Sequence, residues 1–151
     1  MVAYNIVKQQ GVDIFKYVKA GPMEYGETSL IAEDIIRSTD PALQWVLENI
    51  PEPVNGGRTT ISQMYTGLYW VRGDNFVVGG KNYTGINLAS QSSTRPRLNV
   101  ILQSGFTGYD LYTSSYEYIN YVYDPSSGST RMCLSTHSTN IDKGWSFIKV
   151  S

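Results

Sequence analysis

From Arg58 to the end of the chain, short β-branched and aromatic runs alternate with glycine, asparagine and serine, and this pattern constrains the fold most. Runs of about four to eight such residues, bounded by turn formers, are typical of antiparallel strands. We therefore predict a jelly-roll-like β-sandwich over residues 58–151. The expected strands lie near residues 59–65, 67–72, 75–79, 83–89, 97–103, 108–113, 116–123, 130–136 and 145–150.

The segment that precedes this region, residues 1–57, has a different pattern. Ser29 and Asp40 are residue types that cap helix starts, and Pro41 suits a first helical turn. We predict one or two helices between residues 29 and 50, docked on the sheet or on a neighbouring subunit, and an α+β fold overall. The apolar residues that recur at helical spacing there are Leu30, Ile31, Ile35, Ile36, Leu43, Val46, Leu47 and Ile50.

The composition excludes several classes of protein. The chain has 151 residues, of which 41% are hydrophobic and 17% charged, and a formal net charge of -1. Neither half carries a run of basic residues, so a nucleic-acid partner is not expected. No segment approaches the roughly 20 apolar residues of a membrane-spanning helix. No internal repeat is evident, so the sequence does not predict a repeat architecture.

The chain carries one cysteine, Cys133, and its first ten residues lack the apolar core of a signal peptide. We therefore expect synthesis in the cytoplasm, without an intrachain disulfide. Cys133 and the only histidine, His137, are too few for a zinc site, which draws three or four ligands. The sequence predicts neither a metal site nor a cofactor.

Residues 72–74 read Arg-Gly-Asp, a tripeptide that integrin ligands display. The tripeptide joins two apolar runs, and Gly73, Asp74 and Asn75 are all types that tolerate the positive φ of tight hairpins. We therefore interpret residues 72–75 as the tip of a hairpin. A second hairpin loop is expected at residues 124–129.

Tyrosine is unusually frequent, with 12 residues in the chain, more than a core of this size can hide with satisfied hydroxyls. In residues 116–123, alternate side chains face opposite ways and neither face is purely polar, so both faces are expected to be covered. Tyrosine and tryptophan are enriched at interfaces, where one end of the side chain is dry and the other meets a polar partner. The candidate binding residues are Arg72, Asp74, Tyr112, Tyr116, Tyr118, Tyr121, Tyr123 and Trp145.

Glu117, Arg131 and His137 follow one another in an order that could carry hydrolysis. A carboxylate takes a hydroxyl proton, an arginine steadies a phosphate and a histidine protonates the leaving oxygen. Over these roughly twenty residues, ending in Thr-His-Ser-Thr, the sequence resembles the small microbial guanyl-specific ribonucleases. That resemblance implies a ribonuclease with these three catalytic residues.

The sequence favours a non-enzymatic structural or attachment module over this hydrolase. We expect a self-assembling phage virion component, such as a tail, fibre or head accessory protein, in contact with other virion proteins. Its external ligand would be a cell-surface glycan. A monomeric carbohydrate-binding module is the remaining alternative, and it differs from the first in oligomeric state.

Overall fold

The computed structural model describes residues 2–11, 14–24, 27–35, 40–105, 107–136 and 144–150. This part of the chain forms thirteen strands and one short 3-10 turn, η1 (Pro41–Leu43). The strands are β1 (Tyr4–Gly11), β2 (Ile14–Glu24), β3 (Glu27–Asp34), β4 (Trp45–Leu47), β5 (Gly57–Thr59), β6 (Ile61–Gln63), β7 (Tyr69–Val78), β8 (Lys81–Ala89), β9 (Val100–Ser104), β10 (Tyr109–Tyr112), β11 (Tyr118–Asp124), β12 (Ser129–Ser135) and β13 (Trp145–Lys149).

The strands form one antiparallel sheet that closes on itself. Hydrogen-bonded neighbours run β11-β12-β3-β8-β7-β6-β4-β1-β13-β10, and β10 pairs back with β11 to complete a circuit of ten strands. The protein is therefore a closed antiparallel β-barrel with 61% strand and 2% helix. The expected α+β sandwich with an N-terminal helical segment is wrong.

The helices expected between residues 29 and 50 are strands for a physical reason. Short apolar runs have no periodicity that separates a helix from a buried strand. Leu30, Ile31 and Ala32 are all buried, because β3 pairs with β2 on one edge and with β8 and β12 on the other. The cap at Asp40 and the place of Pro41 in the first turn are as expected, but the turn, η1, spans only three residues: Asp40 Oδ1 accepts from the backbone N–H of Ala42 at 2.9 Å. Ile36 lies outside the described residues.

The strand pairings show a threefold arrangement, although no internal repeat is evident in the sequence. Six segments form a ring, in which β5 and β6 are separated by one residue and act together: β1, β4, β5/β6, β9, β10 and β13. Three hairpins, β2–β3, β7–β8 and β11–β12, leave this ring, and their second strands pair with one another in all three combinations. A six-membered ring capped by three hairpins is a β-trefoil.

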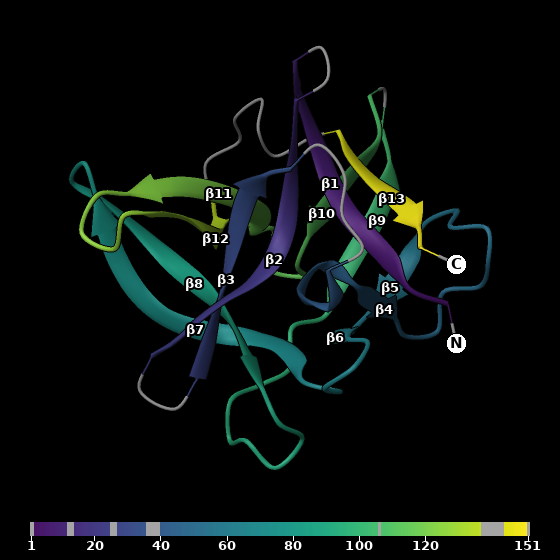
Figure 1. Cartoon of the computed structure of the whole chain (residues 1–151), viewed down its shortest axis with the longest axis horizontal. Coiled ribbons are helices and arrows are strands. Elements are labelled where there is room, and N and C mark those ends of the chain that lie inside the picture. The colour runs from purple at the N-terminus through teal and green to yellow at the C-terminus, as the bar shows by residue number, and fades with distance from the viewer. Residues whose placement is uncertain are drawn as a thin grey trace.

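Figure 1 shows this division, with β1, β13, β9 and β10 on the right beside both chain ends. The hairpins β7–β8 and β11–β12 extend to the left. The last strand, β13, pairs along its length with β1. None of the described segments forms a helix long and apolar enough to cross a membrane.

One hydrophobic core joins the ring to the hairpins, and it draws on both sides of the expected boundary at residue 57. Its three tryptophans are fully buried. Trp45 meets Trp70 edge-to-face with ring centroids 5.5 Å apart, and Trp145 meets Tyr121 in the same way at 6.2 Å. The indole N–H of Trp45 donates to the carbonyl of Val18 at 2.9 Å. The contact between Trp45 and Trp70 crosses the expected boundary and ties the N-terminal segment to the rest of the barrel.

Nearly all the strands expected after residue 58 are present, but the hairpin expected at residues 72–75 is not. Arg72-Gly73-Asp74 lies inside the continuous strand β7, where the register with β8 shifts between Arg72 and Asn75. The turn falls instead at Gly79 and Gly80, whose φ values are 58° and 77°. The tripeptide is therefore a bulge in a strand. The second expected hairpin loop, after Asp124, is confirmed.

The bulge predicts a cost for a side chain at Gly73. A Cβ there would lie 2.9 Å from Oδ1 of Asn87 and 3.0 Å from the carbonyl oxygen of Gly85. We expect Gly73→Ala to lower the free energy of unfolding by about 1–3 kcal/mol, measured by urea denaturation. The control is Asp74→Ala, because that side chain is 80% exposed. Equal stability of the two variants would contradict the strand placement.

Candidate functional site

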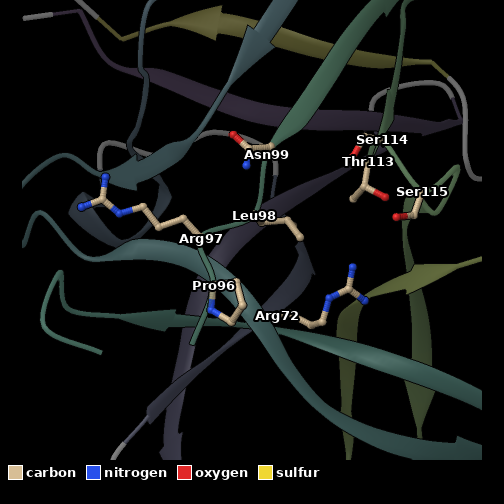
Figure 2. Close-up of a pocket in the computed structure, with 8 residues that line it drawn as sticks. All are labelled: Arg72, Pro96, Arg97, Leu98, Asn99, Thr113, Ser114 and Ser115. Atoms are coloured by element: carbon tan, nitrogen blue, oxygen red, sulfur yellow. The ribbon is translucent and has the colours of Figure 1, made fainter. Parts of the chain in front are cut away.

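A polar cavity of about 140 Å³ lies where β7 faces two loops, the one before β9 and the one between β10 and β11 (Figure 2). Most of its side chains carry hydrogen-bonding groups. The lining residues are Arg72, Pro96, Arg97, Leu98, Asn99, Thr113, Ser114 and Ser115.

The loop of residues 113–117 has a defined shape. Its ends are held by the cross-strand pair Tyr112 and Tyr118 and by the Thr113 N–H, which donates to the Glu117 carbonyl at 2.8 Å. The N–H of Tyr116 donates to the carbonyl of Thr113 at 2.9 Å, and Tyr116 itself has a φ of 58°. This left-handed residue turns the chain sharply. Tyr116 is 76% exposed.

A two-pronged ion pair fixes this loop against β7. The guanidinium of Arg72 donates to the two carboxylate oxygens of Glu117 at 2.8 and 2.5 Å. The hydroxyl of Thr113 donates to the same carboxylate at 3.1 Å. Hydrogen bonds from Arg72, opposed by burial and helped by its charge, hold the pKa of Glu117 below its ordinary value of 4.5. Glu117 is therefore ionised at neutral pH and is a weak base.

The other arginines near the cavity are also engaged. Arg95 pairs with Asp74 at 2.9 Å and donates to the carbonyl of Arg72 at 3.4 Å. Arg97 stacks on the ring of Tyr69, with the guanidinium carbon 3.8 Å from the ring centroid. Figure 2 shows its side chain turned away from Arg72 and Thr113. The remaining polar lining is therefore the hydroxyls of Thr113, Ser114 and Ser115, the Asn99 amide and Arg72, which pairs with Glu117.

The residues expected to form a hydrolytic set are not brought together among the described residues. Arg131 lies opposite Val122 in the β11–β12 hairpin, five residues along from Glu117. At about 3.4 Å per residue this separates them by roughly 17 Å. Arg72, rather than Arg131, is the partner of Glu117. His137 lies outside the described residues.

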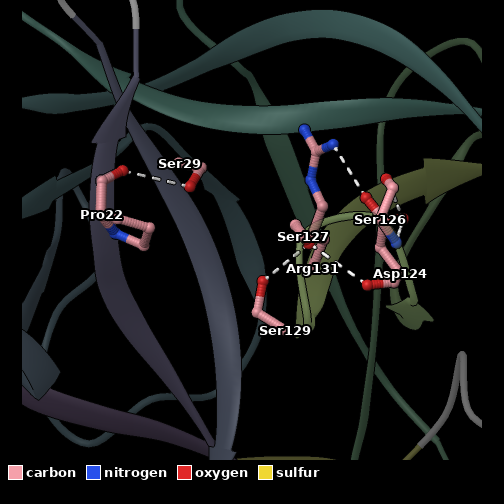
Figure 3. A network of polar contacts seen from close by, with 7 residues as sticks. All are labelled: Pro22, Ser29, Asp124, Ser126, Ser127, Ser129 and Arg131. Carbon is pink, nitrogen blue, oxygen red and sulfur yellow. Dashed lines mark hydrogen bonds and ion pairs between the residues drawn. The ribbon is translucent and has the colours of Figure 1, made fainter.

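Arg131 instead holds two hairpins together. Its guanidinium stacks on Phe76 of β7, 3.9 Å from the ring centroid. The same guanidinium reaches Asp124 at 3.5 Å (Figure 3). Asp124 also accepts from the N–H and hydroxyl of Ser126 at 3.0 and 2.7 Å. The Ser126 hydroxyl is the main cause that lowers the pKa of Asp124. This network shapes the hairpin loop and has the features of a structural clamp.

The aromatic candidates separate into buried and exposed groups. Trp145 and Tyr121 belong to the core, and burial raises the pKa of Tyr121 to about 12. The rings of Tyr112 and Tyr118 pack with centroids 6.1 Å apart, and the Tyr112 hydroxyl donates to Gln103 at 2.9 Å. Tyr123 is 58% exposed on β11. The middle of β11 is covered on both faces by this chain itself.

Sequence reasoning singled out Arg72 and Tyr116 but missed the smaller polar residues of the cavity. Asn99, Thr113, Ser114 and Ser115 carry no motif. The one available signal was the polar stretch Thr-Ser-Ser directly before Tyr116 in a strand-rich region. Within the described part of the chain, no group of three or more His, Cys, Asp and Glu side chains could hold a metal ion.

The structure is similar to that of a Caenorhabditis elegans protein solved by structural genomics and described as having unknown function. The two have a TM-score of 0.64 and are 10% identical, over 96% of this chain and 92% of that one. At this identity the likeness concerns the fold alone. No protein-family model matches the sequence. No curated protein matches it either.

The Arg72–Glu117 pair predicts a pH-dependent stability. A carboxylate with a lowered pKa stabilises the fold above its unfolded pKa, and the gain is lost as pH falls through the folded pKa. We expect Glu117→Gln to cost about 1 kcal/mol at pH 7, a modest value because the Arg72 side chain is 39% exposed. The difference should shrink steadily below about pH 4.5.

Urea denaturation from pH 7 to pH 3 measures this difference. Asp74→Asn is the matched control, because it removes a carboxylate from a pair whose acid is 80% exposed. We expect its effect to stay within about 0.5 kcal/mol. A Glu117→Gln effect that persists unchanged at pH 3 would mean that the ion pair is not its source.

Proposed function

We propose that this chain is a non-catalytic binding module and that its ligand is a carbohydrate, bound at the cavity between β7 and residues 113–117. The observation that supports this most is an exposed Tyr116 on the same loop that lines a cavity with hydroxyl and amide groups. A sugar ring offers hydroxyls for such groups and an apolar C–H face for an aromatic ring. Tyrosine serves both kinds of contact at low conformational cost.

The ion pair and the lowered pKa of Glu117 beside the cavity favour binding over catalysis. Glu117 is neutralised by Arg72, and the lowered pKa of its carboxyl makes it a poor proton acceptor. A general base for hydrolysis would need a pKa nearer the working pH. The hydrolase alternative therefore has less support than a site that holds its ligand without reaction.

A glycan array followed by titration calorimetry tests the proposal. We expect Tyr116→Ala and Asn99→Ala each to weaken the best glycan by about fivefold or more, since truncation of a central contact costs over 1 kcal/mol. Tyr65→Ala is the matched control, because Tyr65 is 66% exposed on a different loop and should leave affinity unchanged. No glycan bound above background, or equal loss in Tyr65→Ala, would reject the site.

An attachment role also requires assembly, for which we propose copies of this chain and other virion proteins as partners. Val77 and Tyr123 support it, because they are 61% and 58% exposed near the ends of two hairpins that Arg131 clamps together. We expect light scattering to give a trimer or larger species that Tyr123→Ser weakens. A monomer at every concentration would leave the carbohydrate-binding module without the virion role.

A further inference from the structure

A second cavity lies at the end of the barrel opposite the three hairpins that cap it. The hairpins continue from the C-terminal ends of β1 and β10, whereas Tyr4 and Tyr109 stand at the N-terminal ends of the same strands. A cavity of about 310 Å³ opens between these two tyrosines, β13 and the loop that follows β4. The carbohydrate proposal makes no use of it.

Three aromatic rings set at steep angles form the walls of this cavity. The ring of Phe147 meets Tyr4 at 83°, with centroids 6.4 Å apart, and meets Tyr109 at 63° and 5.5 Å. Val54 and Pro53 complete the apolar lining. A buried apolar cavity of about 150 Å³ is enough to admit benzene. The larger volume here therefore suits one aromatic ring with a polar substituent.

The hydroxyls of the two tyrosines differ in a way that points to a ligand. The Tyr109 hydroxyl donates to the carbonyl of Val54 at 2.8 Å, so its proton is used. Tyr4 is 5% exposed, and its hydroxyl has no hydrogen-bond partner among the described residues. A buried hydroxyl without a hydrogen-bond partner destabilises the fold, and a ligand that supplies an acceptor removes that cost. Burial, and then the Glu52 carboxylate, raise the pKa of Tyr4, so this hydroxyl keeps a proton to donate.

The charges at the rim favour a neutral molecule. Lys149 and Glu52 pair with each other at 2.5 Å, and both side chains are nearly half exposed. Because the two charges cancel, the rim offers no net attraction to an anion or a cation. No cation lies over the rings of Tyr4, Tyr109 or Phe147 among the described residues.

We propose that this cavity binds a neutral, single-ring aromatic molecule whose carbonyl oxygen accepts the hydrogen bond of the Tyr4 hydroxyl. The ring packs against the side chains of Tyr4, Tyr109 and Phe147, and the carbonyl oxygen lies beside the Tyr4 hydroxyl. This site is separate from the carbohydrate site, and either can fail without the other.

Benzamide is the probe, and its binding is followed by amide chemical shifts in ¹⁵N-labelled protein. We expect shifts at Tyr4, Val54, Tyr109 and Phe147, and none at Asn99 or Ser115. Benzylamine, which has the same ring but a cationic donor in place of the carbonyl, should bind more weakly. Benzylamine binding as tightly as benzamide would overturn the proposal, and so would the absence of shifts around Tyr4.

The decisive variant is Tyr4→Phe, which removes only the hydroxyl. We expect benzamide to bind about three- to tenfold more weakly to it, the range for one net hydrogen bond. Tyr112→Phe is the matched control, because its hydroxyl bonds to Gln103 outside this cavity. If Tyr4→Phe bound benzamide as tightly as the unaltered protein, the Tyr4 hydroxyl would not be the hydrogen-bond donor, and the proposal would be wrong. Glycan titration of the same variant separates this failure from a failure of the carbohydrate site.

Discussion

The structure depends on the mutual pairing of β3, β8 and β12 at the centre of the three hairpins that cap the ring. Each of these strands is the second strand of a hairpin, and each pairs with the other two. Exposed strand edges leave backbone groups unpaired and invite association. In this structure the second strands of the three hairpins provide backbone hydrogen-bonding partners for one another. The ring below them can therefore close around a core that holds all three tryptophans.

Arg131 adds a side-chain link to this backbone arrangement. Its stacking on Phe76 and its contact with Asp124 connect the β7–β8 hairpin to the β11–β12 hairpin. Gly85 leaves room for it, because a Cβ there would lie 3.1 Å from the guanidinium. The arginine that the sequence assigned to catalysis thus contributes to packing. Arg72, which borders the polar cavity, likewise links two segments of the fold, through its two hydrogen bonds to Glu117.

How far the sequence could predict this fold depended on the range of the interactions. The strands after residue 58 were predictable because alternation and turn residues act locally. Leu30, Ile31 and Ala32 were not, because their strand, β3, pairs not only with the nearby β2 but also with β8 and β12, which lie far away in sequence. The threefold order is a property of pairing and leaves no repeated motif. For the same reason Arg72 and Tyr116 were visible as candidates, whereas the Arg72–Glu117 pair, 45 residues apart, was not.

The two cavities lie at opposite ends of the barrel, and β10 connects them. Tyr109 borders the aromatic cavity, and Thr113, just beyond the end of β10, borders the polar one. At about 3.3 Å per residue they are roughly 13 Å apart along the strand. The buried Leu111 lies between them. Sites this far apart that share no partner respond to substitution almost additively. A variant at one end is therefore a valid control for the other, and measurable coupling between them would require movement of β10 itself.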